Sequence, residues 1–255
     1  MATYEELWAD TLDRKFDADF KKIRTLTWLP WIGKRFDRTR VLVITKLHPT
    51  RAQESADALD NKKKMVGDGM LTREMIAEYP LQGYDAGWIF KAGHRNSATF
   101  DNVSNVLCGS SLLSDADAKK RTTLWSSVAF MELVQKPMWY KGKEREKPVP
   151  NDFMEGWETA IKVVQIIKPK LSIVFGLETA DHFNVFVKAQ SEIRFGLAER
   201  DGKIGKSYPR SARIELEGDW LPIRFVPSMY FPCREWREFA FSGLDEIKAC
   251  FVDLK

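Results

Sequence analysis

The chain has 255 residues, of which 44% are hydrophobic, and its 40 Lys and Arg residues outnumber its 36 Asp and Glu residues, for a formal net charge of +4. This length and apolar content predict one folded domain, 1–255, and the small basic excess suits a polyanionic partner such as DNA without requiring one. Three widely spaced Cys residues argue against a disulfide framework or a thiolate metal site, and no apolar run reaches the roughly 18 residues of a membrane span.

The amino-terminal segment is charged and has no apolar stretch of signal-peptide length, so we expect a cytoplasmic protein without a membrane partner. Apolar residues at helical spacing predict one amphipathic helix over 5–24, and an aromatic loop follows at 28–33. The β-branched apolar run 40–44 predicts a strand buried on both faces, which ends in a polar loop, 45–49. Residues 50–98 show no strong period, and we expect loops and short helices there.

The middle of the chain alternates between helical and strand patterns. Helical spacing begins at Thr99, whereas the apolar segment 124–135 fits a strand or a helix equally well. A helical stripe then runs from 153 to 167 and must end at Lys168, because proline disfavours α geometry in the residue before it. Residues 171–176 predict a second buried strand.

The last third of the chain predicts a hairpin, a strand and two closing helices. Residues 193–197 and 212–216 alternate in polarity, and Asp201-Gly202 between them is a turn signal, so we expect a β-hairpin excursion. A strand at 223–226 opens into Pro227. Strands that alternate with helices predict a three-layer α/β fold, with a central, mainly parallel four-stranded sheet flanked by helices.

In this order, the segments resemble the uracil-DNA glycosylase superfamily in its divergent bacterial branches. The matching pieces are the Trp-Leu-Pro-Trp-Ile-Gly loop at 28–33, the strand and loop at 41–48, the Trp-Ser-Ser-Val-Ala-Phe segment at 125–130 followed by Val134-Gln135, the Gly-Trp helix that runs into Lys168-Pro169, the strand at 171–176 and the final strand that opens into Pro227-Ser228. The resemblance implies a parallel sheet whose strand ends form a pocket for a nucleotide flipped out of DNA.

Three places depart from the family's pattern for uracil. The first loop reads Thr-Lys-Leu-His-Pro at 45–49, where the family normally has a Gly and a water-positioning Asp or Asn. The last loop reads Val226-Pro227-Ser228, where the family commonly has His-Pro-Ser, and Ser126 stands where an Asn often reads the base. The resemblance therefore implies either a substrate other than uracil or a protein that binds without cutting.

Breaking an N-glycosidic bond builds positive charge on the sugar and negative charge on the departing base, so a site needs an anion near the sugar and a donor near the base. We expect His48 to be the donor, with a capping or packing role for this loop residue as the alternative. Glu132 is the candidate that orients water or reads an amino group of the base, and the alternative is a solvated carboxylate on a helix face. Weaker acidic candidates are Asp85, Asp101 and Asp181.

The resemblance also implies which residues line the site. The base pocket is expected to include Thr45, Lys46, Leu47, Ser126 and Phe130. The expected DNA contacts are Arg51, Arg95, Pro227, Ser228, Met229 and Tyr230. Ser228 would bond a phosphate, while Met229 and Tyr230 would fill the space left by the flipped base. Neither a metal nor a cofactor is expected, because ligand spacings and glycine-rich nucleotide fingerprints are missing.

These features together predict a monofunctional DNA N-glycosylase that flips out and excises a non-uracil, modified base, such as a hypermodified phage cytosine, and leaves an abasic site. By resemblance, such a protein would act as a monomer on double-stranded DNA in antiviral defence. The alternative is a catalytically silent protein that grips DNA or a nucleotide with the same fold. A hydrolase of another α/β family finds little support, because no nucleophile elbow or triad spacing is visible.

Overall fold

The structure is a computed structural model that describes residues 11–47, 69–77, 96–112, 114–136, 138, 140–141, 144–190, 194–228 and 234–252. Its strands are β1 (Trp31–Ile32), β2 (Val41–Leu47), β3 (Val128–Val134), β4 (Tyr140–Lys141), β5 (Glu144–Arg145), β6 (Leu171–Phe175), β7 (Phe195–Arg200), β8 (Arg210–Leu216) and β9 (Asp219–Val226). Its helices are α2 (Asp17–Phe20), α3 (Phe36–Thr39), α5 (Leu71–Ile76), α6 (Asn96–Cys108), α7 (Ala118–Ser126), α8 (Pro150–Ile167), α9 (Thr179–Lys188), α10 (Arg234–Ala240) and α11 (Asp245–Ala249), with a 3-10 helix at Asp115–Asp117.

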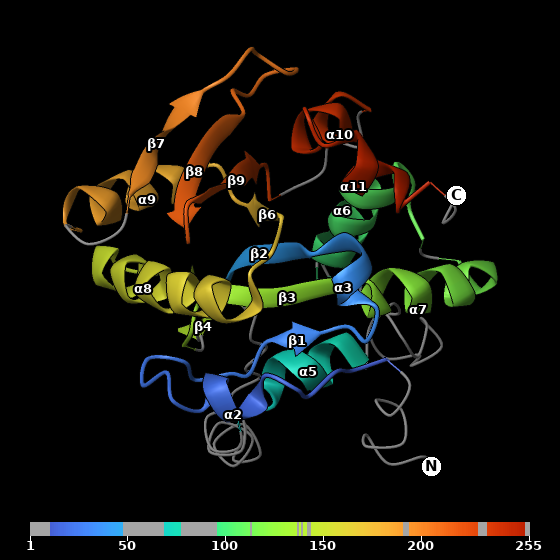
Figure 1. Cartoon of the computed structure of the whole chain (residues 1–255), viewed down its shortest axis with the longest axis horizontal. Helices are drawn as coiled ribbons and strands as arrows, with labels where there is room; N and C mark the ends of the chain where they lie inside the picture. The colour runs from blue at the N-terminus through green and yellow to red at the C-terminus, as the bar shows by residue number, and fades with distance from the viewer. Residues whose placement is uncertain are drawn as a thin grey trace.

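The main sheet has seven strands in the order β1-β3-β2-β6-β9-β8-β7, and β4 and β5 form a separate pair. Strands β3, β2, β6 and β9 pair in parallel, whereas β1, β8 and β7 join the sheet antiparallel to their neighbours. The predicted α/β class is confirmed (Figure 1). The sheet is larger and more mixed than predicted, because β8 pairs with β9 along its whole length. The predicted hairpin is therefore an extension of the sheet and not an excursion from it.

Helices cover both faces of the parallel strands (Figure 1). One core combines side chains of α5, α6, α7 and α10 with Val41 and Val43 of β2, and we term this the α6 side of the sheet. The other combines side chains of α2, α3, α8 and α9 with Leu42 and Ile44, and we term it the α8 side. Successive residues of a strand point to opposite faces, so a strand covered on both faces needs apolar residues at every position. This explains the wholly apolar run in β2.

Helix α8 confirms the predicted helical stripe. It begins at Pro150, whose missing N–H costs little at a helix start, and Asp152 accepts a hydrogen bond from the N–H of Val149 at 2.7 Å. It ends at Lys168, which adopts a left-handed conformation with a φ of 46° directly before proline. Its buried apolar side chains include Phe153, Trp157, Ile161, Val164 and Ile167.

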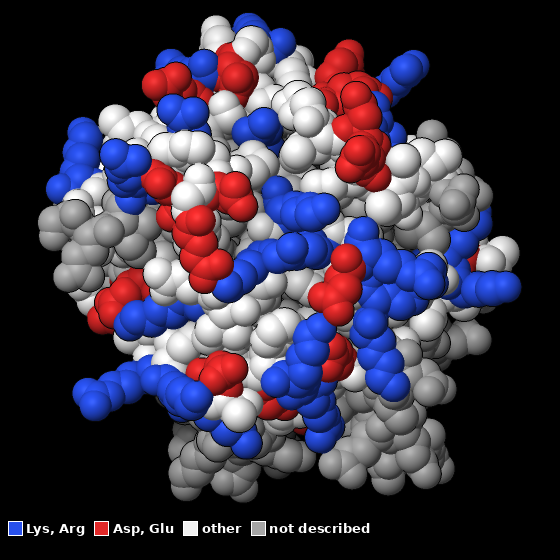
Figure 2. All heavy atoms as spheres, viewed as in Figure 1, with Lys and Arg blue, Asp and Glu red and all other residues white. Residues whose placement is uncertain are grey.

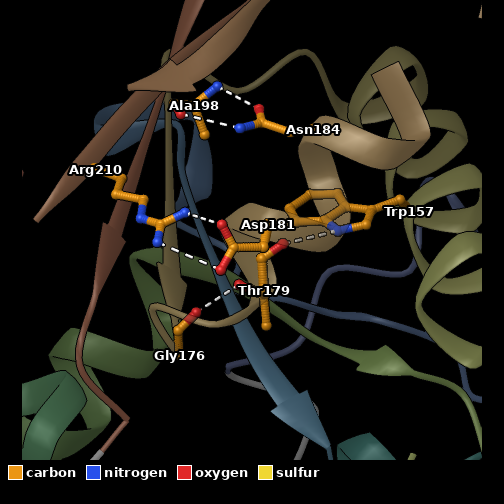
Figure 3. A network of polar contacts seen from close by, with 7 residues as sticks. All are labelled: Trp157, Gly176, Thr179, Asp181, Asn184, Ala198 and Arg210. Carbon is orange, nitrogen blue, oxygen red and sulfur yellow. Dashed lines mark hydrogen bonds and ion pairs between the residues drawn. The ribbon is translucent and has the colours of Figure 1, made fainter. Parts of the chain in front are cut away.

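Helix α9, for which the sequence pattern gives no prediction, is fastened to the β7–β8 hairpin (Figure 3). The Asn184 side chain donates a hydrogen bond to the carbonyl of Ala198 at 3.1 Å and accepts one from its N–H at 2.6 Å. The β7–β8 register shifts between Gly196 and Glu199, and this bulge leaves backbone groups without strand partners. The Asn184 amide therefore replaces ladder hydrogen bonds that the bulge removes.

The amino-terminal region differs from its prediction of one helix over 5–24. In the described part of that range, α2 has only four residues, and Leu12 instead forms an isolated β-bridge with Gly33. The N–H of Asp13 also donates to the carbonyl of Ile32 at 2.8 Å. The extended chain at 12–13 thus lies against β1, an edge strand inside the segment that was predicted to be a loop. Among the described helices, none is long and apolar enough to cross a membrane.

Candidate functional site at the carboxyl ends of the parallel strands

Four residues form a row across the parallel strands near their carboxyl ends. In the strand registers Glu132 is opposite Thr45, Thr45 is opposite Phe175, and Phe175 is opposite Val226. Paired residues of neighbouring strands point to the same face, and Phe175 and Val226 belong to the core on the α6 side. This carboxyl row therefore places two polar and two apolar side chains on the α6 side, at the end of the strands where open α/β sheets bind ligands.

Glu132 is a completely buried carboxyl group in an otherwise apolar strand. Its Oε2 accepts a hydrogen bond from the Thr72 hydroxyl at 2.5 Å, whereas Oε1 has no hydrogen-bond partner among the described residues. Burial raises the pKa of Glu132 to about 7, and the hydrogen bond from Thr72 acts in the opposite direction. The group can therefore hold a proton near neutral pH, and one of its oxygens remains available to a ligand.

The helix that brings Thr72 to Glu132 is held by a buried ion pair. The guanidinium of Arg73 donates to both carboxylate oxygens of Asp17, at 2.9 and 2.5 Å, and its Nε donates to the carbonyl of Pro30 at 2.9 Å. The Arg73 side chain is only 1% exposed. A buried charge is tolerated only where its partners are well placed, so these contacts fix α5 against α2 and the residue before β1.

Helix α6 contributes further polar groups on the α6 side. The Asn102 side chain donates to the carbonyl of Ser228 at 3.0 Å, which ties α6 to the segment that follows β9. Asp101 is also buried, and its Oδ1 has no hydrogen-bond partner among the described residues. Asp101 and Glu132 are thus two buried carboxyl groups on this side of the sheet, each with an oxygen that the described protein groups do not satisfy. Such groups are rare in folded proteins and often mark functional sites.

Lys46, a predicted pocket residue, lies on the other side of the sheet. Its Nζ donates to Oε1 of Glu178 at 2.8 Å and lies 5.8 Å from the ring centroid of Phe153, which belongs to the core on the α8 side. His182 stacks on the same ring with centroids 3.9 Å apart, and burial lowers the pKa of this imidazole. Thr45 and Lys46 are neighbours in a strand, so their side chains point to opposite faces of the sheet.

Ser126 does not lie with the carboxyl row. It ends α7 shortly before β3 begins, so it lies at the amino end of the strand in which Glu132 is near the carboxyl end. Phe130 is completely buried within the core on the α6 side and has no exposed surface. Of the predicted residues, Thr45 and Glu132 lie together, and Ser228 follows β9 at the same end of the sheet.

Several predicted residues lie outside the described part of the chain, namely His48, Arg51, Arg95, Met229, Tyr230 and the side chain of Leu47. The alternative assignment of Glu132 to a solvated helix face is wrong, because Glu132 lies in a strand buried on both faces. Sequence reasoning missed Thr72, which lies in the range 50–98, where no hydrophobic period was present. The bond from Thr72 to Glu132 joins residues 60 positions apart, and no local pattern could have revealed it.

Two surface cavities, of about 690 and 480 Å³, contain no residue of the carboxyl row. The larger is lined by α2, the segment 22–25 that follows it and α8, and the smaller lies at the turn between β8 and β9. Among the described residues, no group of three or more His, Cys, Asp or Glu side chains could hold a metal ion. No protein-family model and no curated protein matches the chain.

Proposed function

We propose that the protein is a monofunctional DNA N-glycosylase that flips out and excises a non-uracil, modified base, such as a hypermodified phage cytosine. The observation that carries this proposal is Glu132, a buried carboxyl group whose pKa is raised to about 7 at the carboxyl ends of the parallel strands. The resemblance to the uracil-DNA glycosylase superfamily supplies the class of reaction. In this proposal, β3, β2, β6 and β9 correspond to the four-stranded parallel sheet that the resemblance implies.

Glu132, and not His48, which lies outside the described residues, is proposed to supply the proton that the departing base needs. As the C1′–N bond breaks, its electron pair moves to the base, which takes up the proton from the carboxyl group. Water adds its hydroxide to C1′, and its remaining proton returns to the carboxylate, so the step balances. Thr72 already donates to Oε2, which leaves Oε1 to carry the proton. Because Glu132 has no exposed surface, neighbouring side chains must move aside when the nucleotide arrives.

The residues around this carboxyl group support a base other than uracil. The segment 45–49, predicted to be a loop, begins with Thr45, Lys46 and Leu47, which are the last residues of β2. It offers no carboxylate to position water, and Val226 replaces the histidine expected before Pro-Ser. A pocket without these uracil-specific groups can be shaped for a larger base. Ser228, half-buried and tied to α6, is the proposed contact to a DNA phosphate.

The test is base release from DNA of defined chemistry. Purified protein is incubated with genomic DNA that carries mixed modified bases, and released bases are identified by mass spectrometry. Oligonucleotides that contain uracil, damaged bases or glucosylated hydroxymethylcytosine are then treated with alkali, which cleaves the strand at abasic sites. We expect release of a modified base by the wild type, loss of at least 100-fold in rate for Glu132→Gln, on the order expected for a general acid, and no change for Glu158→Gln.

Glu158 is the matched control because its carboxylate is half exposed on α8 and, within the described part of the chain, forms an ion pair with Lys162 alone. The absence of base release from every substrate would overturn the proposal. If DNA is bound with no release, the protein is the catalytically silent binder instead. A Glu132→Gln variant as fast as the wild type would remove Glu132 from the chemistry.

A further inference from the structure

The tip of the β7–β8 hairpin lies at the same end of the sheet as the carboxyl row. Arg210, the first residue of β8, pairs with Phe225, and the next residue of β9 is Val226 of the row. The tip, 201–209, therefore extends past the carboxyl end of β9. Ile204 in the tip also packs against the core on the α6 side, the side to which the row points. The tip thus lies at the edge of the proposed active site. Ile204 lies on the α6 side, whereas Arg200 pairs with Arg210, which pairs with Phe225, and so points to the α8 side.

The hairpin carries exposed cations beside exposed aromatic rings. Arg200, Lys203 and Lys206 are exposed and, among the described residues, take part in no ion pair. Tyr208 is 46% exposed, and the charged groups of Arg200 and Lys203 lie 5.6 and 5.9 Å from its ring centroid. Asp201 interacts with Arg224 of β9, which leaves Glu199 as the exposed carboxylate of this region.

A second pair of this kind lies near the β8–β9 turn, at the opposite end of β8 from the tip, and is not part of the surface proposed below. Trp220 of β9 is 43% exposed, and the guanidinium of Arg213 in β8 lies 4.5 Å from the centroid of its ring. The strand registers put Trp220, Arg213 and Arg224 on the same face of the sheet. Cations that track a backbone and aromatic rings that stack on bases are the two elements of single-strand nucleic-acid surfaces.

The hairpin is held rigidly where it presents these groups (Figure 3). Asn184 satisfies both backbone groups of Ala198 at the bulge, and the carboxylate of Asp181 accepts two hydrogen bonds from Arg210. Within the tip, Ile204 and Ser207 exchange two backbone hydrogen bonds, at 2.9 and 3.0 Å. A surface that is ordered before binding loses less conformational entropy when a partner binds.

We propose that the tip of the β7–β8 hairpin binds a DNA strand beside the carboxyl row, with Arg200, Lys203 and Lys206 on phosphates and Tyr208 stacked on a base. The proposal rests on the proposed function only in its choice of DNA as the polyanion. The hairpin surface means these four residues.

A second basic region competes for the same role. Figure 2 shows Lys and Arg side chains across the middle of the molecule, over α3 and the start of β2, as well as at the top, where the hairpin ends. Two cations near these elements serve internal contacts: Arg40, between α3 and β2, donates to the carbonyl of Lys168, and Lys168 pairs with Glu217. This band also lies at the amino ends of the parallel strands, far from the end where such sheets bind ligands.

The test measures DNA binding separately from base release. Fluorescence anisotropy with a labelled oligonucleotide gives Kd over a range of salt concentrations for three variants in the Glu132→Gln background, which is expected to consume substrate at least 100-fold more slowly than the wild type. The cation variant is Arg200→Ala/Lys203→Ala/Lys206→Ala, and the aromatic variant is Tyr208→Ala. The matched control removes three exposed cations of the middle band, Arg35→Ala/Arg38→Ala/Lys170→Ala.

We expect the cation variant to bind at least about tenfold more weakly and to lose about 2 to 3 units of the log Kd against log salt slope, because each phosphate contact contributes about 0.9. The aromatic variant should weaken binding to single-stranded DNA while its salt slope stays unchanged, and the control should bind as the parent protein does. Thermal unfolding verifies that each variant is folded.

Equal binding by the cation variant and the parent protein would overturn this inference, as would a wild type that binds no DNA. Weaker binding by the control, with the hairpin variants unaffected, would assign DNA to the middle band instead. The inference and the proposed function can fail separately. If the hairpin variants weaken binding but the wild type releases no base, the inference stands and the glycosylase proposal does not.

Discussion

The hydroxyl of Thr72 donates a hydrogen bond to Oε2 of Glu132, and this contact joins helix α5 to the only acidic residue of strand β3. The bond stabilises the ionised carboxylate, whereas complete burial stabilises the protonated form, and burial has the larger effect on the pKa. The carboxyl group is therefore poised between two protonation states near neutral pH.

The first prediction concerns the stability of Glu132→Gln at different pH values. The folded pKa of about 7 lies above the ordinary value of 4.5, so the folded state binds more protons than the unfolded state between these values. Below about pH 4.5, the Glu132 carboxyl group makes its full contribution to the stability of the folded wild type. This contribution is lost as the pH rises towards 7. Glutamine does not titrate, so the variant should gain about 3 kcal/mol relative to the wild type between pH 4 and pH 8. Urea unfolding over this pH range measures the difference.

The control for this pH effect is Glu158→Gln, which removes a half-exposed carboxylate paired with Lys162. Its stability relative to the wild type should change by less than about 1 kcal/mol over the same range, because exposed ion pairs contribute little. A flat difference between Glu132→Gln and the wild type would show that Glu132 ionises normally in the folded protein.

The second prediction concerns Thr72→Val, which removes the hydroxyl but nearly keeps the side-chain shape. The hydrogen bond from Thr72 lowers the pKa of Glu132, so its loss should move that pKa above about 7. The basic limb of the pH profile for base release should shift to higher pH, and Thr72→Ser, which keeps the donor, should restore the wild-type profile. A profile that does not move in Thr72→Val would mean that another group sets the basic limb.

The third prediction tests the buried ion pair that positions α5. Asp17→Ala should destabilise the protein by about 3 to 5 kcal/mol, because it leaves the guanidinium of Arg73 buried and without its carboxylate. Arg73→Met combined with Asp17→Ala should recover much of this loss, since no charge then remains buried. Chemical denaturation measures both variants. If Asp17→Ala lowered the free energy of unfolding by less than about 1 kcal/mol, the Arg73–Asp17 pair would contribute no more than an exposed surface ion pair.

The sequence predicted the parts of the fold whose signal is local. The stripe from Phe153 to Ile167 and the proline after Lys168 define α8 without reference to any other segment. The apolar runs of β2 and β6 likewise reflect burial on both faces, which a contiguous pattern can report. These elements follow from residues that are neighbours in the chain.

The candidate site was only partly predictable because its contacts are not local. Glu132 was a candidate because it follows the 125–130 segment by a few residues, but its burial depends on whether 124–135 is strand or helix, and the periodicity fitted both. Thr72 and Arg73 find their partners in β3 and α2, at separations that no window of sequence covers. Ser126 matched a family position by resemblance, yet the boundary between α7 and β3 places it at the opposite end of the strand.

The fourth prediction concerns the close approach of α8 to β3. A Cβ at Gly156 would lie 2.4 Å from the carbonyl oxygen of Leu133, the residue after Glu132. Helix propensity alone favours alanine over glycine by about 1 kcal/mol, but backbone atoms cannot yield as a flexible side chain can. Gly156→Ala should therefore destabilise the protein by about 1 to 3 kcal/mol and slow base release by shifting the strand that carries Glu132.

Gly202→Ala, where a Cβ meets nothing within 4 Å, is the matched control and should stay within about 0.5 kcal/mol of the wild type. Urea unfolding measures both variants, and single-turnover rates compare Gly156→Ala with the wild type. A Gly156→Ala protein as stable as the Gly202→Ala protein and as active as the wild type would contradict the tight packing of α8 on β3.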